Sequence, residues 1–155
     1  MDVASNNKHA GGGGGYAKDI LTVVPGQVYQ FTVGAGGAAG SIWGNGLPLA
    51  GLGGDTRFSI AGVTKVGAYG GRKNLPGQGF QGRVLMTGGI GNWSDNPCSG
   101  GAGANGGSGG SSLFVAGGSV EGYATEPGGG GAACGNAFSQ INTTAGARGR
   151  VVIWW

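Results

Sequence analysis

The stretch GGAGANGGSGG, residues 100–110, decides the fold, because within it glycine returns at every third position from Gly100 to Gly109. A period of three is that of the polyproline II helix, which is extended, rises about 3.1 Å per residue and makes no internal hydrogen bonds. Where glycine sets the period, such segments can lie side by side with their backbones almost touching, and their amides must bond to neighbouring segments. The stretch therefore predicts a packed bundle of glycine-rich segments.

The same three-residue step recurs along the chain, which holds 42 glycines among 155 residues. It appears at Gly34, Gly37 and Gly40, and in the pairs Gly51 and Gly54, Gly67 and Gly70, Gly88 and Gly91, Gly128 and Gly131, and Gly146 and Gly149. An ordered glycine costs about 0.5–1 kcal/mol relative to alanine, so the chain is either disordered or needs its missing Cβ atoms. A charged content of only 10% and clear strand patterns favour order. We expect one domain over residues 11–155, after a flexible tail or linker over residues 1–10.

Short apolar runs between the glycine segments predict β-strands, and no window of useful length has a helical period. Ile20–Val24 and Val28–Val33 flank the turn pair Pro25-Gly26 and predict a β-hairpin. Thr56–Ile60 and Val63–Val66 predict a second hairpin.

Three further strands are expected, at Arg83–Met86, Ser112–Ala116 and Arg150–Trp155. The last must pair with another strand, since an unpaired β-rich run is prone to aggregate. Phe58, Trp154 and Trp155 are expected to be packing residues of these strands. The predicted fold class is all-β and coil: short antiparallel β-strands flanking a packed bundle of polyglycine II helices, with essentially no α-helix.

The charge and motifs of the chain disfavour several classes of function. The net charge of +3 comes from nine cations with no run longer than Arg72-Lys73, whereas nucleic-acid binding normally needs a concentrated basic face. No stretch is apolar enough to insert into a membrane. Matches to G-x-S-x-G at 106–110 and to G-x-G-x-x-G at 101–106 lack the strand and helix around them that the chemistry needs. We therefore expect no enzyme and no cofactor, and with His9 the sole histidine, no metal site.

Two cysteines, Cys98 and Cys134, lie in separate glycine-rich stretches. They are either a disulfide that ties two loops together or two unpaired thiols in a protein folded in a reducing cytoplasm. The sequence leaves both readings open.

Aromatic and polar residues concentrate in the linkers between glycine segments. Aromatic side chains on rigid loops offer a large contact area with few rotatable bonds, and beside Asn, Asp and Arg they suit carbohydrate recognition. The alternative for each aromatic residue is that it covers the small core. The candidate binding residues are Trp43, Asn45, Arg72, Lys73, Asn74, Phe80, Trp93, Asp95, Tyr123 and Glu126.

Four motifs in this order resemble the glycine-rich domain found at the tips of bacteriophage tail fibres and in related phage adhesins: Gly11–Ala17, Pro25–Gly37, Gly53–Phe58 and Gly149–Trp155. The resemblance implies short β-strands flanking packed polyglycine II helices, with variable loops at the distal edge. Those loops would contact a bacterial surface receptor, either the glycan of lipopolysaccharide or an outer-membrane protein. The chain departs from the family at Arg57, where a small residue is usual, and in its two cysteines.

The resemblance also implies where such a protein acts. It would be made in the host cytoplasm, sit at the distal end of a virion's tail fibre and act outside the cell. Its partners would be the receptor and the rest of the fibre, and a homotrimer is one arrangement it could take.

Three other readings stay open for the sequence. The domain could be a structural fibre end that supports assembly without binding a receptor. It could be an antifreeze-type polyglycine II protein, although the bulky residues that interrupt its segments disfavour a flat ice-binding face. The glycine-rich region of certain animal receptor kinases is disfavoured because the framework and signal peptide of those proteins are missing.

Overall fold

The structure is a computed structural model, and it describes residues 11–38, 52–72, 75–91, 98–109, 111–115, 118–135 and 141–155. Within these residues every regular element is a β-strand and none is a helix. All strand pairs are antiparallel. The predicted all-β and coil class is therefore confirmed.

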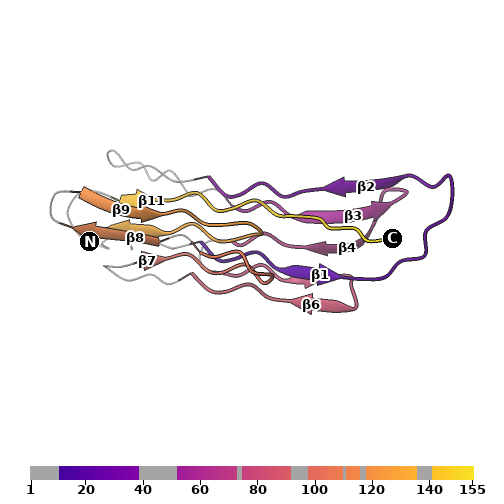
Figure 1. Ribbon diagram of the computed structural model, residues 1–155, viewed down its shortest axis with the longest axis horizontal. Helices are drawn as coiled ribbons and strands as arrows, with labels where there is room; N and C mark the ends of the chain where they lie inside the picture. The colour runs from indigo at the N-terminus through magenta and orange to yellow at the C-terminus, as the bar shows by residue number, and fades with distance from the viewer. Residues whose placement is uncertain are drawn as a thin grey trace, which may run out of the picture.

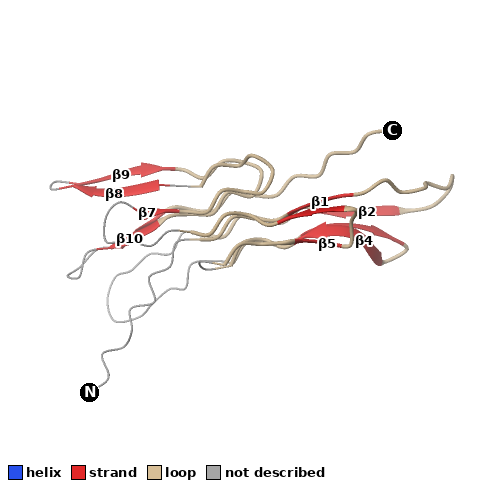
Figure 2. Ribbon diagram, turned by 90° about the horizontal axis from the view of Figure 1, so that it is seen from below, coloured by secondary structure: helices blue, strands red, loops and turns tan. Residues whose placement is uncertain are grey.

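The molecule is elongated, and its strands gather at two ends with glycine-rich segments between them (Figures 1 and 2). The β1–β6 end holds β1 (Tyr16–Lys18), β2 (Tyr29–Thr32), β3 (Thr56–Ile60), β4 (Val63–Ala68), β5 (Gly79–Phe80) and β6 (Val84–Met86). The β7–β11 end holds β7 (Cys98–Ser99), β8 (Ser111–Val115), β9 (Gly118–Gly122), β10 (Ala133–Gly135) and β11 (Ile141–Thr143).

The β1–β6 end contains a four-stranded sheet in the order β2-β3-β4-β5 and a separate pair formed by β1 and β6. The hairpin of β3 and β4 confirms the second predicted hairpin. Its two-residue turn places Ala61 at φ 49° and Gly62 at φ 77°, as a type I′ turn requires, and the twist of such a turn matches that of the strands. Strand β6 confirms the strand expected at Arg83–Met86.

At the β7–β11 end, three strands form a sheet in the order β7-β8-β9, and β10 pairs with β11. Strand β8 confirms the strand expected at Ser112–Ala116, one residue earlier than predicted.

The first predicted hairpin is wrong. The turn exists, because the Gln27 amide donates to the Val24 carbonyl at 3.2 Å, but Ile20–Val24 is not a strand. Instead β1 pairs with β6, and β2 pairs with β3. The Val24 amide donates to the side-chain hydroxyl of Tyr29 at 2.8 Å. It is therefore not bonded to the backbone of Val28–Val33, as a hairpin of the two runs would require.

The strand predicted at Arg150–Trp155 is also wrong, since these residues pair with no strand among the described residues. Trp154 is 69% exposed and Trp155 fully exposed, so neither is a packing residue here. The ammonium group of Lys18 lies 5.3 Å from the ring centre of Trp154. Phe58 does pack as expected, with its ring 5.8 Å from that of Tyr29.

Between the two ends lies the glycine middle, which we define as the described segments of residues 11–15, 34–38, 69–72, 75–78, 87–91, 100–109, 123–132 and 144–149. These segments bond to one another through their backbones. Gly11 donates to Gly131 at 2.7 Å, Gly101 donates to Gly11 at 2.8 Å, and Gly130 donates to Gly101 at 2.8 Å. The three segments thus close a ring of hydrogen bonds, as a polyglycine II bundle requires. The helical conformation of each segment stays a prediction.

Most buried residues of the described chain are glycines, among them Gly12, Gly13, Gly101, Gly129 and Gly130. A Cβ atom added to Gly13 would stand well inside 3.0 Å of the Ala102 carbonyl, and one added to Gly103 would meet the Pro127 carbonyl as closely. Backbone atoms cannot swing aside as a side chain can. The core of the middle is therefore backbone, and it excludes every residue larger than glycine at such positions.

Candidate binding surfaces

Of the ten candidate binding residues, four lie in the described part of the chain: Arg72, Phe80, Tyr123 and Glu126. The other six lie outside the described residues: Trp43, Asn45, Lys73, Asn74, Trp93 and Asp95.

The β7–β11 end adjoins the connection that contains two of those six residues, Trp93 and Asp95. Val115 pairs with Gly118, so residues 116–117 join β8 to β9, and Gly135 pairs with Ile141, so residues 136–140 join β10 to β11. Residues 92–97, which include Trp93 and Asp95, lead into β7. All of these strands lie at one end of the molecule (Figure 1), so the three connections adjoin the same end.

The longest connection, residues 39–51, contains Trp43 and Asn45 and joins the segment after β2 to the segment before β3. Both flanking segments run from the four-stranded sheet into the glycine middle (Figure 1). This connection therefore starts and finishes on the side of the sheet that faces the β7–β11 end.

Cys98 lies in β7 and Cys134 in β10. Strand β10 lies against both β7 and β8. The two cysteines thus belong to neighbouring strands at one end, and the disulfide between them stays a prediction.

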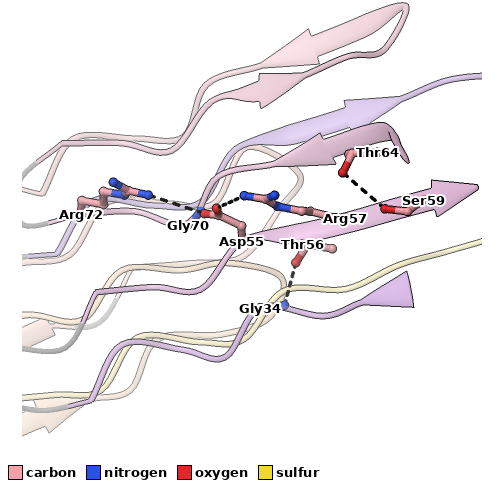
Figure 3. A network of polar contacts seen from close by, with 8 residues as sticks. All are labelled: Gly34, Asp55, Thr56, Arg57, Ser59, Thr64, Gly70 and Arg72. Carbon is pink, nitrogen blue, oxygen red and sulfur yellow. Dashed lines mark hydrogen bonds and ion pairs between the residues drawn. The ribbon is translucent and has the colours of Figure 1, made fainter. Parts of the chain in front are cut away.

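Arg72 belongs to a polar cluster around Asp55, shown in Figure 3. The Asp55 carboxylate is 18% exposed and lies 3.9 Å from Nη2 of Arg72. It also accepts from Nη2 of Arg57 at 2.8 Å and from the Gly70 amide at 3.3 Å. Arg72 and Leu75 exchange two backbone hydrogen bonds, at 2.9 and 2.7 Å. The Arg72 side chain is 56% exposed. Its guanidinium therefore faces Asp55 on one side and is accessible to solvent on the other.

Phe80 is not in a loop, as the sequence suggested; it lies in strand β5. Its ring is half-buried, 4.5 Å from the ring of Tyr69, and it fills the space above Gly67, where a Cβ atom would collide with it. The guanidinium of Arg57 lies 5.7 Å from the same ring. Phe80 is a packing residue, and Arg57 covers it while pairing with Asp55.

Tyr123 and Glu126 lie together in the segment that follows β9. The Tyr123 side chain is 74% exposed, and the Glu126 carboxylate pairs with Arg148. Thr125 holds this segment to Ser108: its hydroxyl accepts from the Ser108 amide at 2.8 Å, and its own amide donates to the Ser108 carbonyl at 3.0 Å. Tyr123 is thus an exposed aromatic group on a firmly held segment.

The β1–β6 end exposes many large apolar side chains, which the sequence indicated as strand cores. Only Ile60 and Ala132 are buried apolar residues in the described part of the chain. We call the exposed set the apolar end: Ile20, Val23, Val24, Val28, Phe31, Val33, Val63, Val84, Leu85, Met86, Val152, Ile153, Trp154 and Trp155. Exposed apolar surface on this scale marks an interaction site. The sequence carried a signal for it, because both faces of the run Val151–Trp155 are apolar.

Comparisons with known proteins found no match to this chain among family models, curated proteins or solved structures. Within the described residues, no group of three or more His, Cys, Asp or Glu side chains is placed to hold a metal ion. The same part of the chain has no helix that is long and apolar enough to cross a bilayer.

Proposed function

We propose that this chain is the tip domain of a bacteriophage tail fibre, an adhesin that binds a bacterial surface receptor through the connections on its β7–β11 side. The observation that carries the proposal is a contrast between two parts of the chain. The glycine middle has no space for side chains at its backbone contacts, whereas the connections between segments contain large aromatic and polar residues. The packed backbone of the middle fixes glycine at positions such as Gly13 and Gly103. Variation in recognition is then confined to the connections, three of which adjoin one end.

The residue types in those connections support recognition of a glycan or a protein surface. Trp43 and Trp93 fall in connections, beside Asn45 and Asp95, and a tryptophan on a rigid support loses little conformational entropy on binding. Arg72, held by Asp55, adds a charged donor that is already oriented. The receptor class is the lipopolysaccharide glycan or an outer-membrane protein. Several fibres on one particle would multiply a weak single affinity.

A second candidate function is a structural fibre end without a receptor. The apolar end favours it, since a surface of this kind serves attachment to another protein. The two functions are compatible in one domain, because the strands of the apolar end and strands β7–β11 lie on opposite sides of the glycine middle (Figure 1).

Binding of the purified, labelled domain to a panel of bacteria tests the proposal. The panel contains wild-type strains, strains with truncated lipopolysaccharide and strains that lack individual porins. We expect saturable binding that one class of mutant abolishes. Absence of saturable binding on every wild-type strain, including hosts of a phage that carries this chain, would leave the structural fibre end as the function.

A matched pair of variants locates the binding side. Arg72 and Arg83 are both more than half exposed and each pairs with an aspartate, at 3.9 Å and 3.0 Å. Arg83 lies between β5 and β6, at the β1–β6 end, whereas Arg72 lies in the glycine middle. We expect Arg72→Ala to weaken binding about tenfold, as for a charge-assisted contact of about 1.4 kcal/mol, and Arg83→Ala to leave it unchanged. Equal effects of the two variants would contradict the assignment of the binding side.

A further inference from the structure

We propose that Arg150–Trp155 adds as a strand to the free edge of β2 in a second copy of this chain, so that copies are joined by exchange of this segment. The inference does not rest on receptor binding. It starts from an unpaired segment and a strand edge at the apolar end, neither of which has a further partner strand among the described residues. Strand β2 is at the edge of its sheet, bonded to β3 on one side, and Arg150–Trp155 is bonded to no strand within the described residues. A free strand edge is a ready template for another chain.

The hydrogen bonds just before this segment set its register. Gly146 donates to Gly37 at 2.9 Å, and Gly149 donates to Gly34 at 2.9 Å. The two segments therefore run antiparallel, and each step forward from Gly149 matches a step backward from Gly34. Continued past Gly149, this register sets Ile153 opposite Gln30 and brings the whole of Arg150–Trp155 along Val28–Val33.

The segment does not follow that path in its own chain. Figure 2 shows the end of the trace marked C departing from the sheets instead of running beside β2. Trp155 is fully exposed and Ile153 is 51% exposed. Along β2, Phe31 is 45% exposed, and Val33, just beyond the strand, is 49% exposed. The segment that would be exchanged, Arg150–Trp155, and the edge of β2 that would receive it thus both expose apolar side chains.

The residue pattern of the segment favours a second copy over its own sheet. Side chains alternate between the two faces of a strand, and Val151, Val152, Ile153, Trp154 and Trp155 leave no polar residue on either face. A strand that is apolar on both faces is one buried on both faces. An added strand continues the plane of the sheet, so the sheet itself covers neither of its faces. The apolar end of the other copy supplies the layer that covers them.

The area available is adequate for a stable assembly. An aromatic side chain carries 150–250 Å² of surface, so Trp154 and Trp155 together expose on the order of 400 Å² in each copy. Reciprocal exchange buries these residues twice, along with Phe31, Val33, Val152 and Ile153. The total approaches the roughly 1,200–2,000 Å² of a standard interface. Exchange of an identical segment between copies is also a low-cost route to dimers.

The test uses the full chain with two separate substitutions, Gln30→Cys in one preparation and Ile153→Cys in the other. The two proteins are unfolded together, refolded as a mixture and oxidised, and the linked peptides are identified by mass spectrometry. We expect a disulfide between positions 30 and 153 of different chains, and a mass of two or more chains by light scattering. A monomeric mass without this link would overturn the proposal.

Two further variants separate exchange from pairing within one chain. A chain carrying both substitutions that remains a monomer and links positions 30 and 153 internally would show that the segment completes its own sheet, which also overturns the proposal. A chain that stops at Gly149 should be monomeric and retain the circular dichroism of the parent. If that shortened chain fails to fold, the mixed-cysteine experiment still decides the question, because it removes no residue.

Discussion

The glycine middle and the β1–β6 end are stabilised by opposite means. In the middle, backbone contacts backbone: Gly13 donates to Gly89 at 2.9 Å, and Gly89 donates to Ala102 at 2.7 Å. At the β1–β6 end, strands are paired in the usual way, but their apolar side chains face outward and only Ile60 among them is buried. One region is closed within a single chain, and the other leaves most of its large apolar side chains exposed.

The difference shows how a chain this rich in glycine can fold without a conventional core. A hydrogen bond contributes only about 0.5–1.5 kcal/mol net, but the middle forms many, and the amides of buried glycines such as Gly13, Gly101 and Gly130 donate to adjacent segments. That arrangement tolerates no Cβ atom at the contacts. The β1–β6 end tolerates side chains freely, so the surfaces that meet partners are found there and in the connections.

The largest expected effect is that of a single methyl group in the middle. In Gly13→Ala the new Cβ would collide with the Ala102 carbonyl and crowd that of Gly101, and neither can move without breaking inter-segment hydrogen bonds. We expect no cooperative thermal transition by circular dichroism. A Gly13→Ala protein that melts as the parent does would refute the account of the middle as packed backbone.

The control is Gly106→Ala, in the stretch of residues 100–110. A Cβ atom there meets nothing within 4 Å, and the residue has φ 97°. Its glycine is therefore needed for a left-handed turn and not for close packing. We expect a folded protein destabilised by about 1–2 kcal/mol, the cost of a side chain in that conformation. The sequence assigns Gly103 and Gly106 to one periodic pattern, and the structure gives them different roles, close packing at Gly103 and a turn at Gly106.

A smaller effect is expected at the β1–β6 end, where Ile60 is the buried apolar residue. Ile60→Ala should lower the free energy of unfolding by about 2–4 kcal/mol, and Ile60→Val by about 1 kcal/mol. The control is Val63→Ala, since Val63 is paired opposite Ile60 yet is 57% exposed. It should change stability by less than about 0.5 kcal/mol. Chemical denaturation measures all three; a Val63→Ala loss as large as that of Ile60→Ala would mean that this face is covered within one chain.

Much of the fold could be predicted because its signals are local. Glycine spacing indicated the middle, and the β3–β4 hairpin followed from two alternating runs around Ala61-Gly62. The prediction of the first hairpin was wrong because two apolar runs around a turn, Ile20–Val24 and Val28–Val33, have the sequence pattern of paired strands whether or not they pair. Ile20–Val24 is not a strand at all. The strand before it, β1, pairs with β6, and β2 pairs with β3, as set by which segments the glycine middle brings together.

The candidate sites were predicted less well, for a related reason. Phe80 is an aromatic residue amid turn residues, and nothing local shows that Gly67 leaves a space for its ring. The cluster around Asp55 joins residues from β3 and from the segment after β4, and only the fold shows that they meet. Trp154 and Trp155 of the apolar end were expected to be packing residues, because a hydrophobic pattern does not show whether a face is covered within the chain.

The smallest expected effect concerns the ion pairs that flank the middle. Asp55 is 18% exposed and serves two guanidinium groups and an amide, whereas Glu126 is 43% exposed and pairs with Arg148. A partly buried acceptor with several donors contributes more than an exposed pair, whose contribution is about 0–1 kcal/mol. We expect Asp55→Asn to lower the free energy of unfolding by about 1–2 kcal/mol and Glu126→Gln by less than about 0.5 kcal/mol.

Salt should distinguish the two pairs as well. Screening acts on exposed charges more than on partly buried ones, so 1 M sodium chloride should remove most of the small Glu126→Gln difference and leave most of the Asp55→Asn difference. Denaturation curves at low and high salt measure both. If the Asp55→Asn loss disappeared in salt, the cluster would be an ordinary surface ion pair. The orientation of Arg72 would then have to come from the Arg72–Leu75 backbone bonds alone, which would remove the support that the middle gives to the binding side.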